Sequence, residues 1–109
     1  MNVKISSLES FLLVGVEGRI DTTNASEFEL PLMELIQGGN TKIILDCSEL
    51  NYISSSGLRV FLVIQKKMVA LKGQFKLCNL QPGIKEIFDI SGFSSIFSVF
   101  PDAAAASKE

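Results

Sequence analysis

The chain of 109 residues contains no histidine, no tryptophan and only two cysteines. The missing histidine removes the commonest general base and the commonest metal ligand together. Positive charge is also sparse, because ten lysines and arginines face twelve acidic residues, for a net charge of −2, and no dense basic run occurs. Nucleic-acid-binding proteins normally carry a basic stripe, so this composition argues against a nucleic-acid partner.

Long hydrophobic runs are missing as well. The apolar run 11–16 is far too short to span a bilayer, and no basic segment or small-residue cleavage site marks it as a signal peptide. Cys47 and Cys78 lie far apart in apolar surroundings, whereas short chains from oxidising compartments carry several closely spaced cysteines. We therefore expect buried, reduced thiols in a soluble, cytoplasmic protein without direct membrane insertion.

What the chain does contain is enough apolar sequence for one modest core. Apolar residues make up 47% and charged residues 20% of the sequence, which is typical of a globular domain. We expect one domain over residues 1–101 and a flexible C-terminal tail over 102–109. The four consecutive alanines of this tail predict either a frayed end or a weak terminal helix.

Hydrophobic periodicity predicts the element order β-β-α-β-α-β-α-β. Pro31 is expected to bend the first helix or to shift its start. Strands that alternate with helices predict an α/β domain whose mixed β-sheet carries its helices largely on one face. The predicted strands are 3–6, 11–16, 41–47, 75–78 and 96–100, and the predicted helices are 25–37, 58–71 and 82–90.

A serine-rich turn, Ser54-Ser55-Ser56-Gly57-Leu58, joins the predicted buried strand to the longest predicted helix. The first amides of a helix lack partners, so one serine oxygen there can serve as a cap worth about 1 kcal/mol. Three serines exceed that need, and glycine weakens a helix by up to ~1 kcal/mol, which suggests close approach of another chain. The residues alone therefore allow two interpretations of the turn, a structural cap and a functional site.

The stretch from Leu45 to Leu58, LDCSELNYISSSGL, resembles the signature of bacterial anti-sigma factor antagonists. These proteins belong to the STAS (sulfate transporter and anti-sigma factor antagonist) domains. Three further stretches are similar to the same family: 18–21 before the first helix, 73–77 after the second, and 82–93 at the third helix and its exit. The resemblance covers nearly the whole chain in the same order and implies a single STAS-like domain.

The family's turn reads Asp-Ser/Thr-Ser/Ala-Gly-Leu, and the residue after the aspartate is phosphorylated by an anti-sigma factor with kinase activity. Alignment on Gly57-Leu58 puts the acceptor at Ser55, with Ser54 in place of the aspartate and with Ser54 and Ser56 as alternative acceptors. The resemblance implies a partner-switching protein that binds an anti-sigma factor/serine kinase, leaves it on phosphorylation and is reset by a phosphatase. The chain has no glycine-rich phosphate-binding motif, so the partner should supply ATP and magnesium and no cofactor is expected.

Two carboxylates complete the candidate site. Asp21 and Asp46 are predicted at strand ends, where they can bind loop amides or shape the partner surface with Ser54–Leu58. The sequence offers no histidine, metal-ligand cluster or activated nucleophile beside these two carboxylates, so we do not expect the protein to be an enzyme.

Two other functions stay open. The missing aspartate at Ser54 favours a non-phosphorylated scaffold subunit of a lipid-transport or sensory complex. A cleft near Asp21, Asp46 and the serine turn would instead suit a small-molecule or nucleotide sensor. Either function would use the same fold without a phosphorylation switch.

Phenylalanines divide into two groups. Phe28, Phe61, Phe75 and Phe88 fall inside predicted elements and are expected in the core. The group near the tail, Phe93, Phe97 and Phe100, is also expected to pack, although self-association into a homodimer is left open.

Overall fold

The computed structural model describes residues 1–108. Five strands form one sheet in the spatial order β1-β2-β3-β4-β5. The strands are β1 (Asn2–Leu8), β2 (Phe11–Ile20), β3 (Lys42–Ile53), β4 (Gln74–Cys78) and β5 (Ser98–Phe100). The helices are α1 (Ala25–Gln37), α2 (Ser55–Ala70), α3 (Pro82–Ser91) and α4 (Ala103–Ser107), with a short 3-10 helix η1 (Phe93–Ser95).

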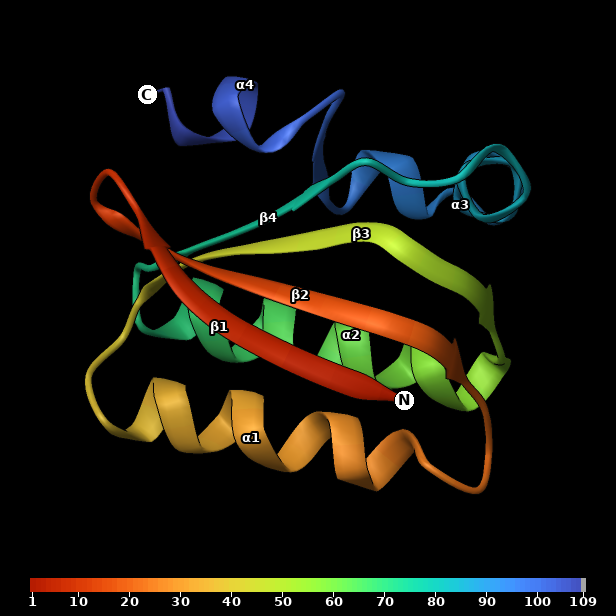
Figure 1. The fold of residues 1–109 in the computed structure, drawn as a ribbon, viewed down its shortest axis with the longest axis horizontal. Coiled ribbons are helices and arrows are strands. Elements are labelled where there is room, and N and C mark those ends of the chain that lie inside the picture. Colours follow the sequence, from red (N-terminus) through yellow and green to blue (C-terminus); the bar gives the residue numbers. More distant parts are fainter. Residues whose placement is uncertain (109) are drawn as a thin grey trace.

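The strand order explains where the helices lie. β1 and β2 form an antiparallel hairpin, and β2, β3, β4 and β5 are parallel to one another. Because spatial order follows chain order, successive right-handed crossovers place their helices on the same face of the sheet. α1 and α2 lie side by side on that face, and α4 lies on the other (Figure 1). This arrangement confirms the predicted α/β class and its largely one-sided helices.

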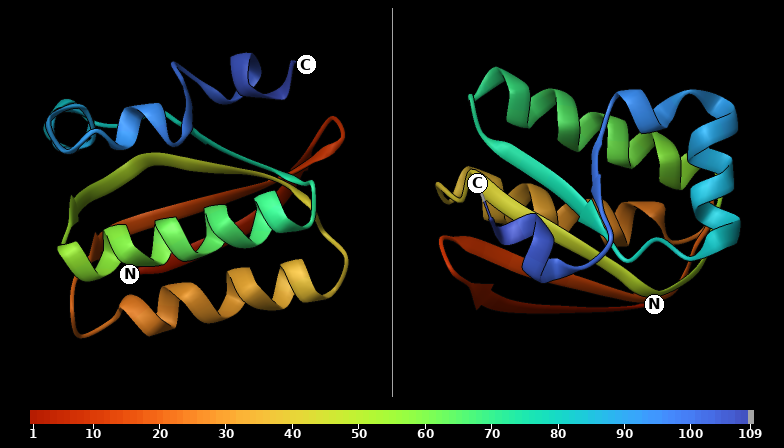
Figure 2. Two further views of the ribbon diagram at one scale, coloured as in Figure 1. Left: turned by 180° about the vertical axis from the view of Figure 1, so that it is seen from behind. Right: turned by 90° about the horizontal axis from the view of Figure 1, so that it is seen from above.

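The views from behind and above show α1 and α2 on one face of the sheet (Figure 2). The main core consists of buried residues of the sheet and of the helices packed against it. Phe61 of α2 is fully buried at its centre, and its ring centroid lies 5.5–6.4 Å from four other phenylalanine rings. Phe97 is one of these and is 5% exposed, so packing rather than exposure accounts for it. The other three rings belong to Phe28, Phe75 and Phe88, as expected from the sequence.

Several element boundaries differ from the predicted ones, and two of the differences bear on the serine turn. β3 continues six residues past Cys47, because its backbone stays paired with β2 up to Ile53. This pairing includes two register shifts, and several polar side chains of the added segment are exposed. α2 begins at Ser55 rather than at Leu58, so the serine turn forms the first turn of the helix. α1 runs unbroken through Pro31 and keeps its predicted start at Ala25.

The C-terminal segment packs on the second face of the sheet. Of the two interpretations of the alanine run, the structure contains the helix, α4, which Asp102 caps by accepting a 2.8 Å hydrogen bond from the amide of Ala105. Ala106 is fully buried, and its carbonyl accepts a 2.9 Å hydrogen bond from Lys76 Nζ. Glu109, the last residue of the predicted tail, lies outside the described residues.

No helix within residues 1–108 is long and apolar enough to cross a membrane.

Candidate functional site

The serine turn lies at the C-terminal end of β3, where the chain enters α2. The amide of Ser54 donates a 2.9 Å hydrogen bond to the carbonyl of Ile20, the last residue of β2. Ile20 also pairs with Ile53, the last residue of β3. α1 and α2 both begin at this end of the sheet, on the right in Figure 1. The turn is therefore fixed to two strand ends beside two helix N-termini.

Ser54 is the N-cap of α2. Its backbone is extended (φ −87°, ψ 173°), and its side-chain oxygen accepts a 3.2 Å hydrogen bond from the amide of Gly57. The first turn of α2 contains no acidic residue. Ser54 thus supplies the acceptor that an aspartate at this position would also supply, but without the negative charge.

Removing this cap should measurably destabilise the domain. We expect Ser54→Ala to lower the free energy of unfolding by about 1 kcal/mol, which for a domain of this size lowers the melting temperature by about 4–6 °C. Ser54→Asp keeps an acceptor and should retain wild-type stability. Thermal unfolding followed by circular dichroism measures both, with Ser55→Ala as the control, and equal melting temperatures for the two alanine variants would contradict the capping role.

Ser55 and Ser56 differ in their surroundings. Ser55 is exposed, and its hydroxyl forms no hydrogen bond with residues 1–108. Ser56 is half-buried, and its hydroxyl lies 3.4 Å from that of Thr22, in the loop between β2 and α1. Of the three serines, only Ser55 therefore presents a hydroxyl that is both exposed and without a partner among the described residues.

Gly57 is buried against the two strand ends. A Cβ atom built on it would lie 2.7 Å from Ile53 Cγ1 and 2.8 Å from Ile20 Cγ2. The close approach that this glycine permits is made by the chain's own strands, in place of the second chain that the sequence suggested. Leu58 is half-buried and packs against the main core. Gly57 and Leu58 therefore lie on the core side of the turn and hold it in position.

Asp21 organises the loop next to the serine turn. Its Oδ1 accepts hydrogen bonds from the hydroxyl of Thr23 (2.6 Å) and from the amide of Thr23 (2.9 Å). The Thr23 hydroxyl is the main cause that lowers the pKa of this half-buried carboxyl below its usual value. Asn24 closes the same loop, because its Oδ1 accepts a 2.8 Å hydrogen bond from the Asp21 amide. Asp21 thus shapes the loop that contacts Ser56 through Thr22.

Two residues that the sequence did not single out lie at the same end of the sheet. Arg19 and Tyr52 are paired across β2 and β3, with the guanidinium carbon 4.4 Å from the ring centroid. Arg19 Nε also lies 3.5 Å from Asp21 Oδ2. Only the parallel register of β2 and β3 reveals this pair, because the two residues are distant in sequence. Both side chains are exposed and widen the surface around the turn.

Asp46 does not join this site. It lies inside β3 rather than at a strand end, eight residues before Ser54, which is roughly 25 Å along an extended strand. Its neighbours in β3 belong to the main core, so its side chain faces the other side of the sheet. There its Oδ1 accepts hydrogen bonds from the Ser48 amide (3.0 Å) and from Asn79 Nδ2 (3.1 Å). The expected cleft that combined Asp21, Asp46 and the turn is not formed.

Both cysteines are free and fully buried. Burial raises the pKa of the Cys78 thiol to about 12 and raises that of Cys47 well above its ordinary value. They lie in separate clusters of buried residues, Cys47 in the main core and Cys78 beneath α4. Neither thiol has the accessibility or the thiolate character of a reactive cysteine.

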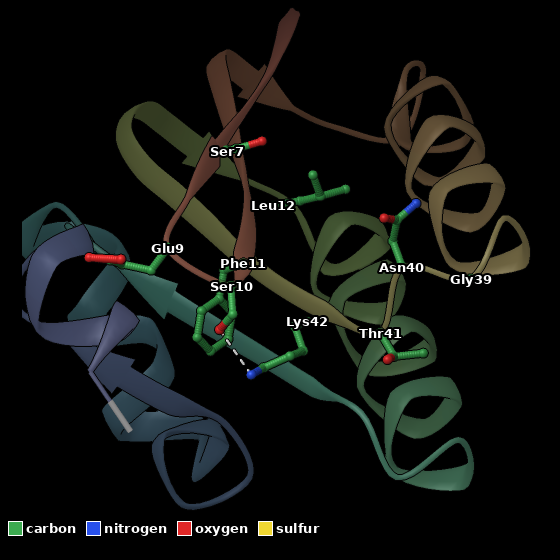
Figure 3. Close-up of a pocket in the computed structure, with 9 residues that line it drawn as sticks. All are labelled: Ser7, Glu9, Ser10, Phe11, Leu12, Gly39, Asn40, Thr41 and Lys42. Carbon is green, nitrogen blue, oxygen red and sulfur yellow. Dashed lines mark hydrogen bonds between the residues drawn. The ribbon is translucent and has the colours of Figure 1, made fainter.

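A polar hollow of about 310 Å³ lies at the other end of the sheet, between the β1–β2 turn and the loop before β3 (Figure 3). Lys42 Nζ donates a 2.9 Å hydrogen bond to Ser10 Oγ there and lies 4.9 Å from the ring centroid of Phe11. The hollow contains none of the predicted site residues. Across the part of the chain that the structure describes, no group of three acidic, cysteine or histidine side chains could hold a metal ion.

The chain is similar to known proteins over nearly its whole length. Residues 2–106 match the STAS domain model. BtrV of Bordetella bronchiseptica, which carries the name of an anti-sigma factor antagonist, is 36% identical over 106 residues, covering 97% of this chain and 91% of BtrV. The anti-sigma-B factor antagonist of Bacillus subtilis is 31% identical over 100 residues, covering 91% of this chain and 90% of that protein.

Solved structures share the fold. TM1081 of Thermotoga maritima superposes with a TM-score of 0.91 at 18% identity, covering 95% of this chain and 90% of that one. Bacillus SpoIIAA in its phosphorylated form superposes with a TM-score of 0.73 at 20% identity, covering 95% of this chain and 96% of SpoIIAA. At these identities the two structures show a common architecture.

Proposed function

The chain belongs to the STAS domain family, and from this membership we propose that it is an anti-sigma factor antagonist controlled by phosphorylation of Ser55. In its unmodified form it binds an anti-sigma factor that is also a serine kinase, and the sigma factor is released. Phosphorylation of Ser55 ends this association, and a separate phosphatase restores the first state. The kinase brings ATP and magnesium, and this chain contributes a substrate hydroxyl and a binding surface rather than catalytic groups.

The observation that carries the proposal is the accessibility of the Ser55 hydroxyl at the start of α2. A kinase needs a free hydroxyl that can enter its active site. Ser54 Oγ is held by the Gly57 amide, and Ser56 Oγ lies against Thr22. Ser55 is exposed and has no such contact with residues 1–108, which favours it over its two neighbours as the acceptor.

The fold can accept the phosphoryl group. Phosphorylation adds roughly −1.5 to −2 charges at neutral pH. At the first residue of α2 these charges meet the positive end of the helix macrodipole, and no acidic side chain of the first turn opposes them. A partner that presents acidic or apolar groups to the turn would be repelled instead. The same modification is therefore tolerated by the domain and unfavourable for the complex.

The partner surface on this proposal is the exposed end of the sheet around the turn. It includes Ser55, the Thr22–Thr23 loop that Asp21 organises, and the Arg19–Tyr52 pair. Gly57 and Leu58 act from beneath by holding the turn against the core. Asp46 contributes to the linkage between β3 and β4 on the other face and is not part of this surface.

Incubation with ATP and candidate kinases encoded near this gene tests the acceptor, with phosphate mapped by mass spectrometry. We expect one phosphate on Ser55, full loss of labelling in Ser55→Ala, and continued labelling in Ser56→Ala. Absence of phosphate from all three serines would contradict the phosphorylation switch and favour the scaffold function. Phosphate on Ser56 in place of Ser55 would contradict the assignment of the acceptor alone.

A further inference from the structure

The chain has two arginines, and they differ in what they contact. The Arg19 guanidinium is engaged by both Asp21 and the Tyr52 ring. Arg59 is an exposed residue of α2, and it forms no ion pair or hydrogen bond with residues 1–108. A phosphoryl group added nearby would find Arg59, rather than Arg19, without a competing anion from the described chain.

Helix geometry brings Arg59 to Ser55. The two residues are four apart in α2, so their Cβ atoms lie about 5–6 Å from each other on one face. Side chains on a helix lean toward its N-terminus, which directs the long side chain of Arg59 back over the first turn. A guanidinium is a planar fork of donors that matches two phosphate oxygens, so the spacing suits a bidentate contact.

The surrounding charges favour the same contact. Asp21, on the loop side of the turn, repels a phosphoryl group, and Arg19 partly compensates this charge. The next cation of α2, Lys66, lies about 16 Å along the helix from Ser55. This distance exceeds the screening length of about 8–10 Å at physiological salt, so Lys66 interacts only weakly with a group on Ser55. Arg59 is thus the cation of α2 that lies about one helical turn from the acceptor.

We propose that Arg59 binds the phosphoryl group on Ser55 and holds it against the first turn of α2. This inference rests on the proposed function, because it takes Ser55 as the modified residue. Phosphorylation then changes the partner surface twice: it adds negative charge at Ser55 and it neutralises a cation that an acidic group of the partner could otherwise contact.

A ³¹P NMR titration of protein with phosphoserine incorporated at position 55 during translation tests this contact without any kinase. The second pKa of phosphoserine is ordinarily about 6, and a nearby guanidinium lowers it by favouring the dianion. We expect Arg59→Gln to raise this pKa by about 0.3–0.7 units, in line with an exposed ion pair. Arg59→Lys, which keeps the charge and loses the fork, should give a smaller rise.

Lys66→Gln is the matched control, since it removes one positive charge from the same helix. A shift in Arg59→Gln that is absent from Lys66→Gln supports the contact. Equal pKa values in the unsubstituted and Arg59→Gln proteins, or equal shifts in the two glutamine variants, would overturn it. Because the phosphoserine is genetically encoded, such a result is distinct from failure of a kinase to label Ser55, which bears only on the proposed function.

Discussion

Phosphoserine at position 55 is expected to weaken binding to the anti-sigma factor kinase by about 100-fold, and Ser55→Asp by about tenfold. A like-charge contact at an interface costs several kcal/mol, and each 1.4 kcal/mol is tenfold in the dissociation constant. Aspartate has the smaller effect because it adds one charge, whereas phosphoserine adds nearly two. Isothermal titration calorimetry against the kinase that labels Ser55 measures both dissociation constants.

The fold itself should be almost unaffected by either change. A negative group at the first residue of α2 is favourable for the helix, so the free energy of unfolding should change by less than about 1 kcal/mol. Ser55→Ala should bind the partner within about threefold of wild type. Ser7→Asp is the charge control, since Ser7 is exposed on β1 and lines the hollow at the other end of the sheet. Wild-type affinity in Ser55→Asp, or equal losses in Ser55→Asp and Ser7→Asp, would contradict the predicted mechanism.

Element order could be predicted from the sequence because hydrophobic periodicity is a local signal. The spacing of Phe28 and Leu32 marks α1, and both residues are fully buried. Glycines 38 and 39 end that helix at Gln37 as expected. The family resemblance supplied the identity of the fold, and the matched residues 2–106 confirm it.

The boundaries of the elements were harder to predict from the sequence, because they depend on contacts between distant segments. Residues Ser48 and Asn51 are polar, yet they continue β3, since parallel pairing with β2 needs only the backbone and leaves one face open. Serines are poor helix formers, so nothing local placed Ser55 inside α2. Its position follows from the Ser54 cap and from the hydrogen bond between the Ser54 amide and Ile20.

The candidate site, like the fold, could be predicted only in part from the sequence. The turn was recognisable from its residues, but the different roles of Ser54, Ser55 and Ser56 as a cap, an unpaired hydroxyl and a loop contact depend on the three-dimensional arrangement of the described residues. Asp46 was grouped with Asp21 because both were predicted at strand ends. β3 continues past Asp46, however, and strand alternation turns its side chain to the other face.

The last prediction concerns Gly57, where two opposite effects compete. Alanine in place of glycine favours a helix by about 0.5–1 kcal/mol. At Gly57 the new Cβ would lie 2.7–2.8 Å from branch atoms of Ile20 and Ile53, which are buried on the strands and cannot move freely. Such overpacking costs about 1–3 kcal/mol, so we expect Gly57→Ala to lower the free energy of unfolding by about 1–2 kcal/mol.

Gly83 offers the same substitution without the clash. It is the second residue of α3, and a Cβ built there has no neighbour within 4 Å. Gly83→Ala should therefore raise the free energy of unfolding by up to about 1 kcal/mol, while Gly57→Ala lowers it, as measured by urea denaturation. A stabilised Gly57→Ala protein would refute tight packing beneath the turn. Gly57→Ala should also weaken partner binding. The added methyl group pushes the turn away from the ends of β2 and β3, and this movement displaces Ser55.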